Sequence, residues 1–425
     1  MARRRRRAVL VERVDPGEPV RTDELEELAV SAGYEVVDTV VQARREDPRY
    51  HIGRGKVEEV ARRVKDGKAE VVVFGNELTP VQAFNLAGEL GVPVIDRFKL
   101  ILEIFARRAR TREAKLQVKL AELRYLLPKA REMVNLAKKE ERPGFRGLGK
   151  YEAHKYEEMI RRKIARIERK LEKISKDREL KRKHRHRLGF ELITLAGYTC
   201  AGKSTLMNAL SDAEVPVDEM MFSTLDTKTK AVDLDGHKVL LTDTVGFVDD
   251  LPPWLIESFK STLEETSEAD LVLLVVDVSD PLDEIERKIT VCHRVLEEIG
   301  ADGPTVTALN KADLVGFERA RELAEELEGY VSNPVVVSAK TGEGLEDLKD
   351  VLRSELSRYW RNVRVYLPVT EPESMRLRSF LHEVGKVLDE TWREDGVEMY
   401  VEVSERVVGP LRGRVERIGD IEVLG

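Results

Sequence analysis

Hydrophobic positions in the first part of the chain form short runs separated by stretches of helical spacing. Apolar runs of strand length lie at 8–14, 35–42, 70–74 and 92–95, and helical patterns lie at 22–32, at 79–90 and in a stretch that ends near 64. Strands that alternate with helices indicate a parallel sheet covered by helices. The pattern therefore predicts a small parallel α/β domain, to which we assign residues 1–96.

From residue 97 to 187 the spacing is helical throughout. Leucines at 116, 120, 123 and 127 are spaced four, three, four, and Pro128 should end or kink this run. A glycine-rich break at 142–149 precedes a second helix with largely the same spacing at Tyr156, Ile160, Ile164, Ile167, Leu171 and Ile174. Two such helices joined by a loop predict an antiparallel coiled-coil hairpin.

The third region, residues 188–360, begins with a buried-strand pattern at 190–195 followed by a phosphate-binding loop pattern. Glycines, a lysine and a serine stand at the required positions of the segment formed by Gly197, Tyr198, Thr199, Cys200, Ala201, Gly202, Lys203, Ser204 and Thr205. The glycines let backbone N–H groups turn toward phosphate oxygens at the start of a helix. We expect Lys203 to reach the β- and γ-phosphates and Ser204 to ligate Mg²⁺.

Two downstream segments have the features of nucleotide-sensing switches. The first comprises Phe222, Ser223, Thr224, Leu225 and Asp226, and the second comprises Asp243, Thr244, Val245 and Gly246. A threonine hydroxyl such as that of Thr224 can complete the Mg²⁺ shell only while the γ-phosphate is present. The Asp243 carboxylate should hold Mg²⁺, usually through water, and the Gly246 N–H should reach the γ-phosphate.

Further apolar runs of strand length lie at 239–243 and 271–278, and guanine recognition is predicted at the end of the next one, at 304–309. The next residues are Asn310, Lys311, Ala312 and Asp313, and a further strand at 334–337 leads into Ser338, Ala339 and Lys340. The Asp313 carboxylate can accept hydrogen bonds from the ring N1–H and the exocyclic amine of guanine, which adenine lacks. Motifs at the carboxyl ends of successive strands fit the ligand crevice of an open α/β sheet.

The last region, residues 361–425, reads as a strand, a helix at about 373–390 and two further strands. It predicts a small α+β domain and carries no recognisable chemistry. The fold class is therefore α/β: a P-loop GTPase domain preceded by a small parallel α/β domain with a coiled-coil hairpin, and followed by the α+β domain.

Composition narrows the setting and the partners. The chain has 425 residues and a net charge of −7. It has only two cysteines, which excludes a disulfide framework and fits a reducing compartment. No apolar run approaches the length of a membrane span, so we expect a cytoplasmic protein. Arg3 to Arg7 form either a solvated tail or an arm that touches RNA.

Positive charge is concentrated on the second helix of the hairpin. The side chains are those of Arg161, Arg162, Lys163, Arg166, Arg169, Lys170, Lys173, Lys176, Lys181, Arg182, Lys183, Arg185 and Arg187. Interspersed glutamates allow an ordinary solvated coiled-coil surface, whereas the excess after Lys176 favours a nucleic-acid contact. The turn His51-Ile-Gly-Arg-Gly-Lys56 resembles a phosphate loop but lacks the full spacing, so we interpret it as a structural turn.

With these motifs in place, the chain resembles the HflX family of GTPases along nearly its full length. The signatures are Tyr50 to Val57, Ile95 to Arg97, Ile104 to Val118, and the two switch segments ending in Asp226 and Phe247. The resemblance implies a GTPase that binds the large ribosomal subunit and its rRNA and can separate subunits under stress. The chain departs from the family at two places. One is the linker Gly147 to Glu152, whose role the sequence leaves open, and the other is Cys200, where the family usually has Asn.

The residue after Gly246 bears on the rate of hydrolysis. Phe247 stands where many signalling GTPases place a glutamine that orients the attacking water, and an apolar ring cannot do this. We therefore expect slow intrinsic hydrolysis of GTP to GDP by a monomer whose partner completes the site. Two alternatives remain: a GTPase that times ribosome assembly or RNA modification, and a regulator directed at other proteins.

Overall fold

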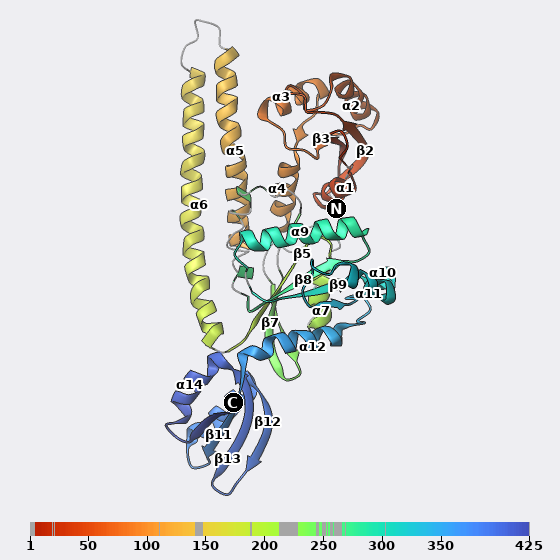
Figure 1. The fold of residues 1–425 in the computed structure, drawn as a ribbon. Helices are drawn as coiled ribbons and strands as arrows, with labels where there is room; N and C mark the ends of the chain where they lie inside the picture. The colour runs from red at the N-terminus through yellow and green to blue at the C-terminus, as the bar shows by residue number, and fades with distance from the viewer. Residues whose placement is uncertain are drawn as a thin grey trace. The chain divides into compact units, whose positions relative to one another are not determined.

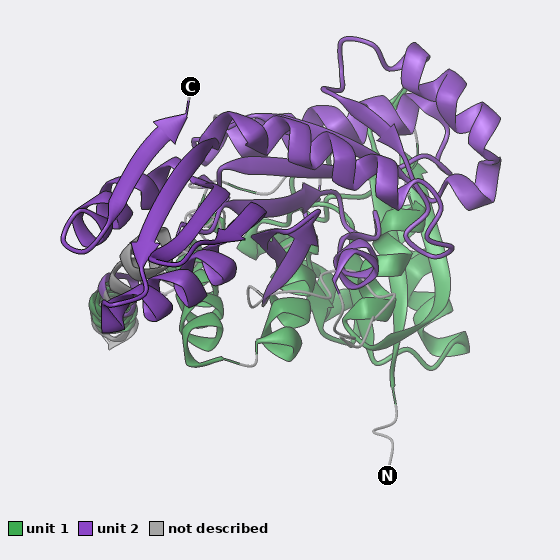
Figure 2. Cartoon of the chain, turned by 90° about the horizontal axis from the view of Figure 1, so that it is seen from below, with its two compact units in different colours: residues 1–173, 219–225, 252–259 green, residues 174–218, 226–251, 260–425 purple. Residues whose placement is uncertain are grey.

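The computed structural model describes residues 5–18, 20, 22–109, 111–140, 148–187, 189–211, 228–243, 246–248, 252, 254–255, 258, 266–267, 269–301 and 303–424. The chain divides into two compact units (Figure 2). One unit comprises Met1–Lys173, Glu219–Leu225 and Pro252–Phe259, and the other comprises Ile174–Asp218, Asp226–Leu251 and Lys260–Gly425. Among the described residues, no helix is both long and apolar enough to cross a membrane.

The first unit begins with the expected parallel α/β domain (Figure 1). Its sheet has the order β2-β1-β3-β4, all parallel, from β1 (Arg6–Val14), β2 (Tyr34–Ala43), β3 (Val71–Phe74) and β4 (Val94–Ile95). The helices are α1 (Thr22–Ser31), α2 (Arg54–Asp66) and α3 (Pro80–Leu90). The alternation in the sequence thus predicted this sheet correctly, because every strand is followed by a helix that brings the chain back.

Three helices follow: α4 (Arg97–Arg108), α5 (Arg112–Glu140) and α6 (Leu148–Arg187). Their apolar seam is the predicted one, with Leu120, Leu123, Ile160 and Ile167 buried together. Two expected boundaries were wrong. The helical run does not end at Pro128, because a proline removes only one N–H from a long helix that is held by its packing, and α5 continues through it. Helix α6 begins at Leu148, inside the expected break.

The second unit contains a six-stranded sheet of order β10-β9-β8-β5-β7-β6. Five of its strands match strands predicted from the sequence. They are β5 (Leu192–Gly197), β7 (His237–Asp243), β8 (Leu271–Asp277), β9 (Thr305–Asn310) and the edge strand β10 (Pro334–Val336). The antiparallel edge strand β6 (Lys228–Leu234) was missed. The helices are α7 (Lys203–Leu210), α9 (Leu282–Glu298), α10 (Ala312–Val315), α11 (Phe317–Glu326) and α12 (Leu345–Leu356).

The C-terminal region of this unit has ferredoxin-like topology, β-α-β-β-α-β. Its elements are β11 (Trp360–Pro368), α13 (Pro372–Val384), β12 (Gly385–Trp392), β13 (Gly396–Ser404), α14 (Glu405–Val415) and β14 (Asp420–Leu424), in the sheet order β12-β13-β11-β14. The expected helix to 390 is wrong, because it ends at Val384 and the residues that follow pair with β13. Helix α14 was missed because Gly409, Pro410 and Gly413 weaken its signal.

Candidate functional site

The phosphate-binding loop joins β5 to α7 and has the backbone that a phosphate cradle needs. Gly197 and Gly202 have φ values of +145° and +95°, and Cys200 between them has a φ of +62°. A Cβ at Gly197 would lie 2.3 Å from the Val275 carbonyl oxygen, and one at Gly202 would lie 2.3 Å from Asn310 Nδ2. Both positions therefore require glycine, and the left-handed turns direct successive N–H groups to one side.

Lys203 is the first residue of α7, and its side chain is buried beneath this loop. Its Nζ donates hydrogen bonds to the carbonyl oxygens of Gly197 (2.9 Å) and Tyr198 (2.7 Å). Burial lowers the pKa of the Lys203 ammonium, while the negative charge of Asp243 opposes that shift. A cation held by the backbone of a phosphate loop is placed to move onto a phosphate oxygen when the nucleotide binds.

A candidate metal position lies beside the lysine. The Ser204 hydroxyl, on α7, donates to Asp243 Oδ2 at the end of β7 over 2.6 Å. Both groups offer hard oxygen atoms, the donor type that Mg²⁺ prefers. The third predicted ligand, Thr224, and its neighbours Phe222, Ser223, Leu225 and Asp226 lie outside the described residues, as do Thr244 and Val245.

Gly246 and Phe247 lie against the loop. The Phe247 N–H donates to the Gly197 carbonyl (3.1 Å), and its own carbonyl accepts from the Thr199 N–H (2.8 Å). A Cβ at Gly246 would lie 2.9 Å from Thr199 Cγ2 and 3.0 Å from Lys203 Nζ, so this glycine permits close approach to the phosphate site. The Phe247 side chain is only 2% exposed, so its ring lies in the core and does not face an attacking water.

Asn310 connects the guanine motif to the phosphate loop. Its Nδ2 donates to the Ala201 carbonyl oxygen (2.8 Å), and its Oδ1 accepts from the Ala339 N–H (3.0 Å). Asp313 is exposed, and its Oδ1 accepts from the Ser338 hydroxyl over 2.7 Å. The carboxylate that we expect to read guanine is thus held by the next motif along the chain, and the described predicted residues gather at one edge of the sheet.

Asp277 and Lys288 are two partners of this site that the sequence analysis did not single out. Lys311, which has a φ of +66°, pairs its Nζ with Asp277 Oδ2 over 2.5 Å. On α9, Lys288 lies 5.3 Å from the centre of the Tyr198 ring. Asp277 carried a usable signal, since it ends a buried strand; Lys288 carried none, because it looks like any charge on an amphipathic helix.

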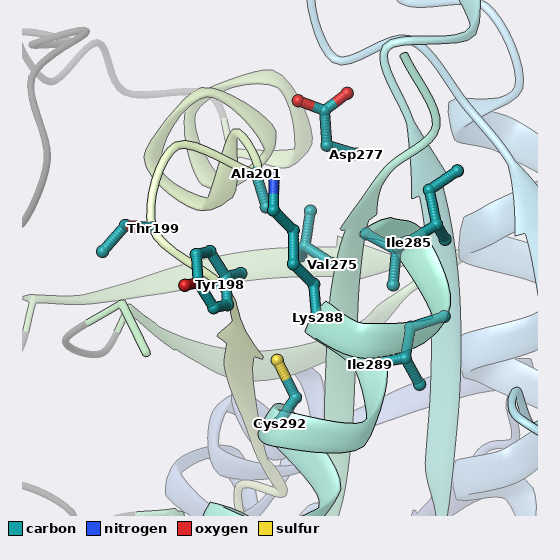
Figure 3. A pocket seen from close by; sticks show the side chains of 10 residues that line it. Tyr198, Thr199, Ala201, Val275, Asp277, Ile285, Lys288, Ile289 and Cys292 are labelled. Carbon is teal, nitrogen blue, oxygen red and sulfur yellow. The ribbon is translucent and has the colours of Figure 1, made fainter. Parts of the chain in front are cut away.

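A small hollow lies behind the loop, between Tyr198 and α9 (Figure 3). Ile285, Ile289 and Cys292 line it from the helix, and Val275 lines it from β8. Burial raises the pKa of the Cys292 thiol to about 12, so the group is a protonated, apolar part of the lining at neutral pH. Asp277 and Lys288 also line the hollow, so both apolar and charged side chains border it.

Comparison with known proteins agrees with this geometry. Three family models match in order: "GTP-binding GTPase N-terminal" over 20–106, "GTP-binding GTPase Middle Region" over 108–185, and "50S ribosome-binding GTPase" over 192–311. A solved structure described as SsGBP in complex with GDP has 25% identity and a TM-score of 0.50, covering 83% of this chain and 99% of its own.

Curated relatives match over most of their length. GTPase HflX of Methanocaldococcus jannaschii is 45% identical and covers 87% of this chain and 89% of its own. GTPase HflX of Thermococcus kodakarensis is 43% identical and covers 97% of this chain and 96% of its own. GTPase HflX of Escherichia coli is 38% identical and covers 88% of this chain and 87% of its own. The resemblance seen in the sequence is confirmed, and with it the hydrolysis of GTP: the chain belongs to the HflX family of GTPases.

Proposed function

We propose that the protein is a GTP-driven switch that binds the large ribosomal subunit through its rRNA and separates ribosomal subunits under stress. It acts in the cytoplasm as a monomer. The observation that carries the ribosomal part is a row of exposed basic side chains along α6. Arg161, Arg162, Lys163, Arg166, Arg169, Lys170, Lys173 and Lys176 are all exposed, and the family model that matches the nucleotide domain is described as a 50S ribosome-binding GTPase.

The nucleotide chemistry follows from the groups at the loop. Lys203 would bind the β- and γ-phosphates, and Mg²⁺ would be held by Ser204, Asp243 and Thr224 and would neutralise charge on the phosphates. The Gly246 N–H binds the γ-phosphate, and Asp313 selects guanine. Since the Phe247 ring is buried, hydrolysis in the free protein is slow, and the partner supplies the group that orients water.

Electrostatics supports RNA as the partner of the hairpin. Part of the positive charge is balanced within the helix, because Arg161 pairs with Glu157 (3.0 Å) and Arg162 with Glu158 (2.6 Å). Exposed pairs of this kind contribute little and exchange readily for phosphate contacts. A GTPase that only times ribosome assembly or RNA modification would use the same face, so the two functions differ in the particle that is bound.

Sedimentation with purified ribosomal subunits tests the proposal. We expect co-sedimentation with large subunits in the presence of a non-hydrolysable GTP analogue and its loss with GDP. Mature ribosomes should also split into subunits in the analogue-bound state, whereas a timing factor would bind only immature particles. Binding neither to purified subunits nor to immature particles in either nucleotide state would refute a ribosomal role and favour a regulator directed at proteins.

A charge-neutralised variant tests which surface binds. Replacing Lys181, Lys183 and Arg185 by Gln should make the negative slope of log affinity against log salt concentration shallower. The expected change is about 0.7–0.9 for each phosphate group that the variant no longer neutralises. The matched control is Arg319→Gln with Arg321→Gln, two exposed basic residues on α11 of the nucleotide domain. An unchanged slope in the hairpin variant would show that these charges are only solvated.

A further inference from the structure

The guanine motif contains a lysine with an unusual backbone conformation. Lys311 has a φ of +66°, a left-handed value that is uncommon for a residue with a side chain. It stands between Asn310, which bonds to the phosphate loop, and Ala312, the first residue of α10. Residues in sparsely populated conformations persist only where their surroundings fix them, and they cluster at binding sites. The backbone at Lys311 therefore indicates that its side chain has a defined place in the nucleotide site.

A carboxylate from the neighbouring strand holds this lysine. Lys311 Nζ lies 2.5 Å from Asp277 Oδ2. Asp277 is the last residue of β8 and lies beside Asn310, the last residue of β9, in the parallel register. The side chains of Lys311 and Asp277 are 31% and 13% exposed. Water and salt therefore screen this pair less than an ion pair on the open surface.

The Asp277 carboxylate is itself fixed by the turn that follows β8. Its Oδ1 accepts from the Ser279 N–H (3.0 Å) and from the Ser279 hydroxyl (2.6 Å). Between them, the Val278 N–H donates to the Asn310 carbonyl oxygen (3.1 Å) and ties the turn to β9. One carboxylate oxygen is thus held by the turn, and the other is directed at Lys311. The position of the lysine ammonium is set by the protein before a nucleotide binds.

An acidic side chain is unusual in a crevice that receives a polyphosphate. Asp277 and Ala201 of the phosphate loop line the same hollow (Figure 3). A carboxylate without a cation at this place would repel the nucleotide, and packing alone would not require one. The next acid of the same turn, Asp280, pairs with Lys288 of α9 over 2.6 Å. Asp277 and Asp280 thus neutralise different lysines, and of the two only Asp277 pairs with a residue of the guanine motif.

We infer that Asp277 is a positioning residue for the guanine nucleotide, because it holds Lys311 in the conformation that the bound base requires. A base held by Asp313, two residues further along, lies within reach of the Lys311 stem, whose methylene groups can cover an apolar ring face. Ordering a long side chain costs conformational entropy, and a contact that orders it before binding removes that cost from the affinity. The inference rests on the proposed role of Asp313, and it concerns binding of the nucleotide rather than its hydrolysis.

A double-mutant cycle tests whether Asp277 acts through Lys311. We expect Asp277→Ala to weaken binding of GDP and of a non-hydrolysable GTP analogue equally, by about threefold to tenfold, the effect of leaving one long side chain to be ordered on binding. Asp277→Asn keeps an oxygen that can accept from Lys311 and should lose less. Adding Asp277→Ala to Lys311→Ala should cause no further loss, whereas independent roles give additive losses. Asp280→Ala, at the neighbouring acid that pairs with Lys288, is the matched control and should bind both nucleotides like the wild type.

Steady-state hydrolysis gives a second measurement, which a general structural defect would change differently. Asp277→Ala should raise the KM for GTP by the same factor while kcat stays within about twofold, because the loss of an interaction made equally with substrate and transition state changes KM alone. Additive losses in the cycle, or a fall in kcat as large as the rise in KM, would overturn the inference. If Asp277→Ala does not fold, Asp277→Asn carries the same test. Unchanged affinity in both Asp277 variants beside a loss in Lys311→Ala would also overturn it, whereas the assignment of guanine to Asp313 would stand.

Discussion

The turns before α7 and before α2 both place glycine between a strand and a helix of a parallel sheet, and of these two only the turn before α7 has the geometry of a phosphate site. In the loop before α7, Gly197 and Gly202 adopt positive φ and Lys203 lies beneath the cradle. In the turn before α2, Gly53 has an ordinary φ of −68°. Its N–H donates to Gln42 Oε1 (2.8 Å), and a Cβ on it would lie 2.1 Å from Arg44 Nη1.

The difference shows that a phosphate site depends on what occupies the turn as well as on glycine content. At the turn before α2 the Gly53 N–H is already bonded to the Gln42 amide, the Arg44 guanidinium packs against the glycine, and Lys56 pairs with Glu59 (2.7 Å). At the loop before α7, positive φ values at Gly197, Cys200 and Gly202 turn successive backbone N–H groups to one side, where a phosphate can bind. These contacts fit the interpretation of the turn before α2 as a structural turn.

Replacing the lysine at each turn by alanine gives the largest expected difference in nucleotide affinity. Lys203→Ala removes a charged donor to two phosphates and should weaken GTP binding by about 3–6 kcal/mol, since hydrogen bonds to charged groups contribute about 1.5–3 kcal/mol each. Lys56→Ala loses only a partly exposed ion pair with Glu59 and should leave nucleotide affinity within about twofold. Binding of a fluorescent guanine nucleotide measures both, and equal losses would erase the distinction between the turns.

Guanine selection adds a second contrast, within the nucleotide site. Asp313→Asn replaces an acceptor by a donor and should weaken GTP binding by about 2–4 kcal/mol while favouring a xanthine nucleotide. Because Ser338 donates to Asp313, Ser338→Ala should cause a smaller loss in the same direction. Competition between guanine and xanthine nucleotides is the measurement, and an unchanged GTP affinity in Asp313→Asn would remove this residue from base recognition.

Adding a methyl group to one glycine in each region should have opposite effects. Gly246→Ala meets Thr199 and Lys203 at 3.0 Å or less, and overpacking of this kind costs about 1–3 kcal/mol, here seen as slower GTP hydrolysis. Gly55→Ala meets nothing within 4 Å inside α2 and should stabilise the helix by about 0.5–1 kcal/mol. Hydrolysis rates and unfolding midpoints test the pair, and normal hydrolysis by Gly246→Ala would contradict the close approach.

Acid should weaken the turn before α2 slightly. His51 is buried, and burial lowers its pKa, with Glu46 opposing the shift and Arg13 assisting it. The fold therefore favours the neutral ring, whose Nε2 accepts from Arg13 Nε (3.2 Å). The unfolded chain binds the proton first, so stability is full above the ordinary histidine pKa and falls as the pH drops through the lowered value.

The matched variant is His51→Asn, because asparagine tolerates the φ of +66° at this position. Part of the acid-induced drop in the unfolding midpoint between about pH 7.5 and 5.5 should disappear in the variant. An identical drop in both proteins would assign the acid sensitivity to other groups.

The parts that could be predicted from the sequence are those where a local requirement fixes residue types. Gly197, Gly202 and Lys203 are demanded by backbone and charge within one loop, so spacing alone located them. The bridge from Asn310 to Ala201 and the pair of Lys311 with Asp277 could not be predicted, because they depend on strands that become neighbours only in the folded sheet. The helical pattern beyond position 384 was misleading for a related reason, since pairing with β13 overrides it.

The stoichiometry of nucleotide binding separates the two turns without relying on a rate. Calorimetric titration of the full chain with a non-hydrolysable GTP analogue and with the corresponding ATP analogue, in the presence of Mg²⁺, counts the sites and identifies the base. We predict one guanine nucleotide per chain, unchanged in Lys56→Ala and lost in Lys203→Ala, and no binding of the adenine analogue. A second site that disappears in Lys56→Ala would contradict the assignment of the phosphate site to the loop before α7 alone.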